Sequence, residues 1–164
     1  MTLLIILGII LIIFPMLFGF GVQLFRKSNK PLENSLLPPK GFLAINLFGL
    51  ILCRRGNKSR INAHTVRHEA IHTAQMRNML YSFFYIWYGI EWFIKLWFCI
   101  KEAKTEYENQ KMSVYMVVHR SFLTVWSNVA YYNVSFEREA YQNDSDITYL
   151  SHRKFFNHLK YLKK

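Results

Sequence analysis

An N-terminal apolar run constrains the fold of this chain more than any other feature of its sequence. No charged residue occurs from Thr2 to Phe25, and Leu3 to Phe20 consists only of Leu, Ile, Gly, Phe, Pro and Met. About 20 such residues in a helix, each adding about 1.5 Å, cross a hydrocarbon layer of roughly 30 Å. A cleaved signal peptide typically has a basic start and a shorter apolar core. We therefore expect residues 1–25 to form an uncleaved transmembrane anchor.

The charges that follow this run predict its orientation. Arg26, Lys27 and Lys30 come directly after it, and no Lys or Arg precedes it. Positive loops stay on the cytoplasmic side, so we expect a single-pass protein of the inner (cytoplasmic) membrane whose remaining residues face the cytoplasm. Cys53 and Cys99 form no disulfide framework or metal motif, which agrees with a reducing compartment.

The composition indicates which partners to expect. The chain has 164 residues, enough for one domain besides the anchor, and 52% of them are apolar, more than in an ordinary soluble domain. Its formal net charge is +11. A positive surface of this kind is attracted to polyanions, and we expect the partner to be anionic membrane lipid. We expect no nucleic acid, because the basic residues follow no recognisable binding motif.

The rest of the chain is expected to form one mainly α (α+β) domain. Residues 26–40 contain several turn formers and the Pro38-Pro39 pair, and we interpret them as a linker. The domain then covers residues 41–164. Its first apolar stretch, Gly41 to Cys53, is too short to span a bilayer and predicts one or two buried strands. A helix is predicted from about Asn62 to Met79, with Asn62 as its N-cap.

Further helices are predicted after this one. The aromatic stretch Tyr81 to Lys104 resembles a membrane span, but Glu91 and Lys95 would be costly in hydrocarbon unless paired or facing protein. We therefore expect a core or interfacial helix there. The remaining predictions are a polar connection at 102–111 and helices at 113–132 and 136–150, the second with Ser135 as a cap. A basic tail at 152–164 is suited either to an anionic membrane surface or to packing on the domain.

The first predicted helix of the domain carries a candidate metal site, His68-Glu69-Ala70-Ile71-His72. Histidines four positions apart lie on one face of a helix, where both imidazoles can bind one zinc ion. Glu69 lies beside the first of them, where its carboxylate can take a proton from a water molecule whose acidity the ion raises. The motif predicts Zn²⁺ as cofactor, His68 and His72 as ligands, and Glu69 as the catalytic base.

A catalytic zinc site usually needs a third protein ligand. Two regions are candidates on spacing alone. One is Ser135 to Tyr141, where Glu137 and the small Ala140 share a helical face; the other is Glu91, which follows His72. Arg77 and the tyrosines Tyr131, Tyr132 and Tyr141 are candidates to stabilise an oxyanion. His64 lies one turn before His68 and is read as a polar residue near the helix start.

His68-Glu69-x-x-His72-x-x-Gln75, followed by Glu137-Arg138-Glu139-Ala140, resembles the gluzincin metallopeptidases, especially small forms whose third ligand begins a Glu-x-x-Ala-Asp motif. The stretch from about Gly41 onward is also similar to a group of uncharacterised small bacterial proteins with the same two elements. The resemblance implies a zincin-like domain with Glu137 as third ligand and a strand within Gly41 to Cys53 at the rim of the cleft. Glu91, by its spacing, and Glu139, with Asn143 as its helper, remain alternatives.

Tyr141 stands where the family pattern has an Asp that orients a zinc-binding imidazole. Loss of such a partner costs about 10- to 100-fold in affinity or activity. The sequence thus predicts a membrane-anchored, zinc-dependent metallopeptidase that acts on a peptide or protein substrate, with His68, His72 and Glu137 as ligands and Glu69 as general base. The alternative is a non-catalytic membrane protein with a structural or vestigial zinc site.

Overall fold

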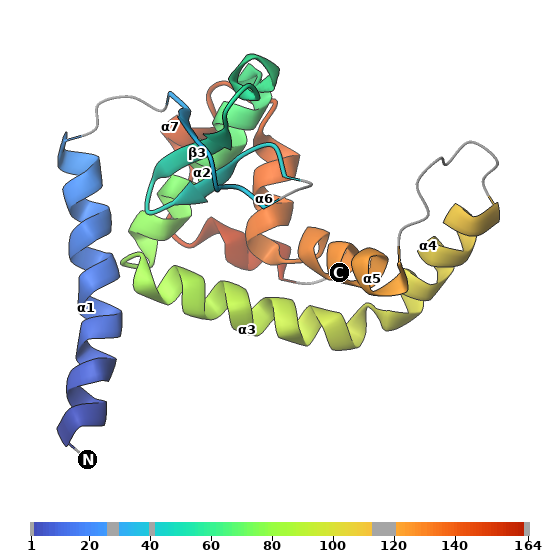
Figure 1. The fold of residues 1–164 in the computed structure, drawn as a ribbon, viewed down its shortest axis with the longest axis horizontal. Helices are drawn as coiled ribbons and strands as arrows, with labels where there is room; N and C mark the ends of the chain where they lie inside the picture. The colour runs from blue at the N-terminus through green and yellow to red at the C-terminus, as the bar shows by residue number, and fades with distance from the viewer. Residues whose placement is uncertain (1, 26–29, 40–41, 113–120, 163–164) are drawn as a thin grey trace.

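The computed structural model describes residues 2–25, 30–39, 42–112 and 121–162. They form a mainly helical fold, as the sequence predicted, with a small sheet of three strands where one or two were expected. In Figure 1, helix α1 stands at one side of the molecule. Helix α3 (Ser82–Phe98) runs across the bottom of the remaining elements. The sheet, α2 (Ala63–Asn78) and α6 (Ser135–Asn143) lie above it.

Helix α1 covers Thr2–Phe25 and includes Pro15. Among the described residues it is the one single helix long and apolar enough to cross a membrane, over Ile6–Phe25. A second candidate combines two helices, α3 and the first part of α4, which pass the same test together but are bent by 67°. The apolar N-terminal helix expected from the sequence is therefore present, and its length and composition suit a membrane span or a signal sequence.

The sheet has the strand order β1-β3-β2. Strands β2 (Ile45–Leu47) and β3 (Leu50–Arg54) form an antiparallel hairpin, so the prediction of strands in Gly41 to Cys53 is confirmed. Phe48 and Gly49 form its turn with positive φ angles of 54° and 86°, a conformation that favours glycine. Strand β1 (Leu32–Asn34) pairs in parallel with β3. Part of the expected linker is therefore a strand, and β2 lies at one edge of the sheet.

Helix α2 covers Ala63–Asn78 and begins where the sequence predicted. The side chain of Asn62 accepts a hydrogen bond from the backbone N–H of Thr65, which satisfies one free donor of the first turn. The short 3₁₀ helix η1 (Lys58–Arg60) precedes it. The buried face of α2 packs on the hydrophobic core, which is formed by Met76, Met79, Tyr81, Phe84, Val134 and Phe136.

The aromatic stretch after α2 differs from the prediction. Helix α3 ends at Phe98, and helix α4 (Ile100–Met112) follows it after a bend of 67°. The expected polar connection at 102–111 was wrong, because these residues are helical. The segment has no apolar stripe of the usual kind, but its Lys, Glu and Ala residues are good helix formers, and Ala103 is buried.

The C-terminal part contains shorter helices than expected. Helix α5 is Phe122–Tyr132, while residues 113–120 of the predicted helix lie outside the described part of the chain. Helix α6 (Ser135–Asn143) begins with Ser135 inside its first turn, so Ser135 is not its cap. The rest comprises α7 (Tyr149–His152) and the 3₁₀ helix η2 (Asn157–Tyr161). His158 of η2 is 1% exposed and stacks on the Phe136 ring.

Candidate metal centre

Three side chains from two helices meet at one point. His68 and His72 lie one turn apart on α2, with their Nε2 atoms separated by 3.1 Å. Glu137 of α6 faces both, its Oε2 3.3 Å from His68 Nε2 and its Oε1 3.3 Å from His72 Nε2. All three side chains are buried, and one potential ligand atom from each lies within 4.8 Å of the others. This group could hold a metal ion.

The spacing of these atoms suits a tetrahedral ion. Two ligand atoms at about 2.1 Å from a tetrahedral Zn²⁺ lie about 3.4 Å from each other. The observed separations of 3.1 and 3.3 Å are close to that value. Among the described residues, Glu137 Oε2 has no hydrogen-bond partner although it is buried. A buried carboxylate oxygen without a partner is costly, and a cation between the three side chains would remove that cost.

The Glu137 carboxylate and the imidazoles of His68 and His72 attract each other electrostatically. Burial by itself would lower the pKa of His72, but the adjacent Glu137 carboxylate raises it to about 9. Burial would likewise raise the pKa of Glu137, yet His72 and His68 lower it well below its usual range. The carboxylate is therefore ionised in a buried site. A negative ligand paired with two imidazoles is a donor set that Zn²⁺ prefers.

Glu91 and Tyr88 of α3 (Ser82–Phe98) hold the ligand-bearing helix α6 in place. The Glu91 carboxylate accepts hydrogen bonds from the backbone N–H and the hydroxyl of Ser135, at 2.7 Å each. It therefore caps α6 from outside, where its charge also favours the helix dipole. Tyr88 donates its hydroxyl to Glu137 Oε1 at 2.9 Å. Glu91, an alternative third ligand in the sequence, thus has a positioning role.

Gln75 joins the two helices on the other side of the site. Its Oε1 lies 2.7 Å from His72 Nδ1, and its Nε2 donates to the backbone oxygen of Phe136 and to Glu139 Oε2, at 3.0 Å each. Glu139 also accepts hydrogen bonds from Tyr149 and Arg153. The second alternative ligand is therefore occupied by a buried hydrogen-bond network, and its neighbour Asn143 donates to the Glu139 backbone oxygen.

The pair formed by Glu139 and Arg153 predicts a large stability effect. The guanidinium contacts both carboxylate oxygens, at 2.6 and 3.1 Å, and the side chains are 0% and 4% exposed. Changing Arg153 to Met leaves a buried carboxylate without its cation, which typically costs about 3–5 kcal/mol. We expect a destabilisation of that size in denaturant unfolding of the detergent-solubilised protein. Lys154→Met, at an exposed neighbour, is the control, and equal midpoints for the two variants would contradict the assignment.

Glu69 is placed beside the three ligands but is not one of them. It is 7% exposed, and Asn46 of β2 donates to its backbone oxygen. Burial raises the pKa of its carboxyl group, an effect that His72 and His68 partly oppose. A raised pKa brings a carboxylate closer to the working pH of a general base. The position of Glu69 therefore suits the role that its place in the motif predicted.

Two cavities adjoin the site, and Glu69 lines both. The first, of about 270 Å³, is bordered by His72, Glu137 and the edge strand β2. The second, of about 550 Å³, is bordered by His68, Tyr141 and Asp144. Tyr131 lines both as well. Burial and the nearby Glu137 raise the pKa of Tyr131, so its hydroxyl stays protonated and can donate a hydrogen bond.

The other candidates for an oxyanion contact are placed differently. Tyr132 and Tyr141 line the second cavity, and the Tyr141 ring lies 4.4 Å from the His68 ring, centroid to centroid. Arg77 is exposed near the end of α2 and lines neither cavity. His64 borders the second cavity, 3.5 Å from Asp144. The geometry therefore favours Tyr131 over Arg77.

A carboxylate that the sequence did not point to lies near His68. Asp144 Oδ2, just after α6, is 3.9 Å from His68 Nδ1, a buried atom without a hydrogen-bond partner among the described residues. Asp144 lies three residues after Tyr141, the residue that differs from the Glu-x-x-Ala-Asp pattern that the sequence resembles. The sequence did offer a clue, because Asp144 is an acidic residue about one helical turn after position 141.

We expect Asp144→Asn to weaken zinc binding by about 10-fold or more, the usual effect of losing a carboxylate that orients a ligand. Competition with a zinc-binding dye measures the affinity. Asp146→Asn is the matched control, because Asp146 is exposed and its carboxylate accepts hydrogen bonds from Thr148. Equal affinities in the two variants would rule out this role for Asp144.

Comparison of the chain with models of protein families, with curated proteins and with solved structures gives no match.

Proposed function

We propose that this protein is a membrane-anchored, zinc-dependent metallopeptidase with a zincin-like domain. The observation that carries the proposal is the buried group of His68, His72 and Glu137, with Glu69 on the same helix and facing both adjacent cavities. Three protein ligands leave the fourth tetrahedral position for water or substrate, the arrangement typical of catalytic zinc. A hydrolase also needs a base within reach of that position, and Glu69 supplies one.

The residues divide the chemistry of peptide hydrolysis among them. Zinc, when bound, polarises the scissile carbonyl and makes water more acidic. The Glu69 carboxylate takes the proton from the attacking water and then delivers it to the leaving amine. The Tyr131 hydroxyl, protonated and lining both cavities, donates a hydrogen bond to the oxygen on which negative charge develops. The ligand-bearing helices stay fixed through Gln75 and Tyr88 during these steps.

The shape of the site supports a polypeptide substrate. Strand β2 lies at the edge of the sheet, and its residues Ile45 to Leu47 border the first cavity. An extended peptide can add to such an edge by backbone hydrogen bonds. Glu69 lines two cavities, one bordered by His72 and Met76 and the other by His64 and His68, so a chain has space in both directions along α2. This favours cleavage within a chain rather than at its end.

The membrane anchor sets the proposed location. Helix α1 has the length and composition of a span, and the first charged residues after it are Arg26, Lys27 and Lys30. By the positive-inside rule the metal site then faces the cytoplasm from the inner membrane. The net charge of +11 favours contact with anionic lipid at that surface.

Hydrolysis of a peptide library by the purified full-length protein tests this function. We expect cleavage products by mass spectrometry, loss of cleavage after treatment with a zinc chelator, and recovery when zinc is restored. Bound zinc without cleavage of any peptide would instead favour the second candidate, a structural zinc site. That candidate is supported by the burial of all three ligands. Absence of zinc would overturn both.

A further inference from the structure

Helix α3 carries a continuous apolar face that is largely exposed in the described part of the chain. Throughout Ser82–Phe98 every exposed side chain is apolar. The exposed residues are Phe83, Ile86, Trp87, Ile90, Phe93, Ile94, Trp97 and Phe98. Trp97 and Phe98 are 79% and 75% exposed. A contiguous patch of this kind marks a surface that meets another apolar phase.

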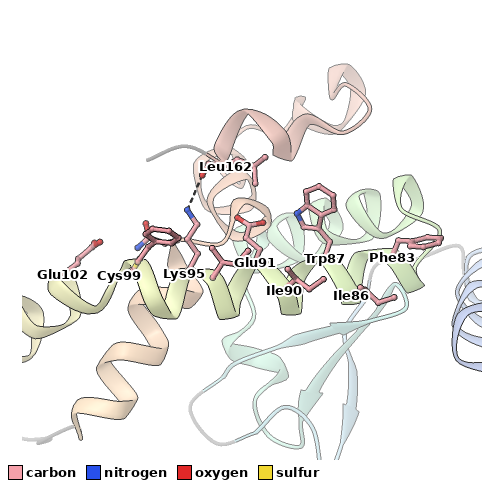
Figure 2. A pocket seen from close by; sticks show the side chains of 12 residues that line it. Phe83, Ile86, Trp87, Ile90, Glu91, Lys95, Cys99, Glu102 and Leu162 are labelled. Atoms are coloured by element: carbon pink, nitrogen blue, oxygen red, sulfur yellow. Dashed lines mark hydrogen bonds between the residues drawn. The ribbon is translucent and has the colours of Figure 1, made fainter. Parts of the chain in front are cut away.

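The two charged side chains of α3 lie at the border of this face, and both are held by protein groups. Glu91 is buried against Ser135, and Lys95 donates to the backbone oxygen of Leu162 at 3.2 Å. Figure 2 shows both projecting from α3 toward the C-terminal segment. From the sequence we expected these charges to be costly in hydrocarbon unless they were paired or faced protein. Because each has a protein partner, the condition under which such charges are tolerated beside hydrocarbon is met.

A hollow of about 790 Å³ extends along the same helix (Figure 2). Its apolar lining includes Ile86, Trp87, Ile90 and Ile94, and Leu162 closes it on the far side. Lys95 and Glu91 form part of its inner wall. The apolar part of this lining suits an acyl chain, and Glu102 and Asn133 add polar groups beside Glu91 and Lys95.

The face ends sharply at the bend after Phe98. Helix α4 begins at Ile100 and turns by 67° from the direction of α3. Its first turns expose Lys101, Glu102 and Lys104. Figure 1 shows α4 rising away from the bottom face of the molecule. The apolar face of α3 thus ends where the side chains become charged.

The face is continuous with the apolar helix α1. Ser82 donates its hydroxyl to the backbone oxygen of Ile12 at 2.5 Å, and the ring of Tyr81 packs against Phe20 and Gly19. A Cβ on Gly19 would come within 2.5 Å of that ring. Helix α3 therefore begins beside the middle of α1. It does not begin beside the C-terminal end of α1, which charged residues follow.

We propose that the exposed face of α3 lies among the acyl chains of the bilayer, as a second membrane attachment running along the membrane. Lipid is favoured over a protein partner for two reasons. The face adjoins α1 within the part that would cross the membrane, and it offers almost no hydrogen-bonding groups, whereas protein interfaces typically have about one hydrogen bond per 100–200 Å². This attachment does not depend on the metal site.

The attachment also places the metal site relative to the membrane. Tyr88, on the inner side of α3, contacts Glu137. The site and the lipid-facing side are thus separated by about one helix diameter, roughly 10–12 Å.

Spin labels on the full-length protein test the proposal in vesicles of phosphatidylcholine and phosphatidylglycerol. Nitroxides go at Phe93→Cys and Trp97→Cys on the face, and at Lys104→Cys and Ile147→Cys as controls. Ile147 is the matched control, because it is apolar and 82% exposed but lies far from α3 in the chain. Background from the two buried native cysteines is measured on the unsubstituted chain.

We expect labels 93 and 97 to be relaxed strongly by oxygen, which concentrates in acyl chains, and weakly by a water-soluble nickel complex. Labels 104 and 147 should show the reverse. Access of the nickel complex to 93 and 97 would overturn the proposal. Protection from both reagents would also overturn it, because a second copy of the chain would then cover the face. Quenching of tryptophan fluorescence by lipids brominated on their acyl chains gives an independent readout on the unsubstituted protein.

Discussion

Changing Glu69 to Gln should abolish peptide hydrolysis while zinc remains bound. General-base catalysis typically contributes about 10²- to 10⁴-fold to the rate, and the amide cannot accept the proton from water. Gln has nearly the same size as Glu. The hydrogen bond from Asn46 holds the backbone of residue 69 and does not use its side chain. The rate constant falls, and the zinc content by elemental analysis stays at about one per chain.

Glu33→Gln is the control for this substitution. Glu33 lies on β1, at the edge of the sheet away from β2, and its side chain accepts a hydrogen bond from Gly56. We expect it to cleave at the unsubstituted rate. Normal cleavage by the Glu69 variant would show that another group activates water, and loss of zinc would show that Glu69 holds the ion.

Replacing His68 and His72 together by Ala should remove the metal altogether. The two imidazoles are two of the three ligand side chains, and one remaining carboxylate cannot hold Zn²⁺ in a buried site against solvent. Elemental analysis of detergent-purified protein should give about one zinc per chain for the unsubstituted protein and none for the variant. Hydrolysis should disappear with the metal.

His152→Ala serves as the control, because His152 is exposed and not part of the group of three. Zinc retained in the double variant would place the ion elsewhere. Absence of zinc from the unsubstituted protein would remove the enzyme proposal and leave a basic, membrane-associated helical protein.

Local sequence signals predicted the parts of the fold that local physics determines. The cap at Asn62 fixed the start of α2, and the apolar run before it contains the strands β2 and β3. Strand β1 was missed because Leu32–Asn34 has no strand pattern and pairs only where tertiary structure brings it beside β3. The bend at Cys99 was missed because the apolar pattern continues through it to Ile100.

The candidate site was predictable to a similar extent. The spacing of His68 and His72 placed both on one face of α2, and the structure brings Glu137 to them as the resemblance implied. Glu91 and Glu139 could not be separated from Glu137 by spacing, because their roles depend on contacts with Ser135 and Arg153. Tyr88 and Asn46 were missed because they come from separate elements, whereas Asp144 ends the helix that carries Glu137.

The position of Gln75 decides which nitrogen of His72 carries a proton. The Gln75 amide nitrogen faces two groups that can only accept, the Phe136 carbonyl and the ionised Glu139 carboxylate, so its oxygen is turned toward His72 Nδ1. An oxygen can only accept, and Nδ1 therefore carries the hydrogen. In the neutral ring this is the tautomer whose lone pair is on Nε2, the atom that faces Glu137. A carboxylate on α6 thus selects, through one amide, the tautomer in which an imidazole on α2 can bind a metal ion.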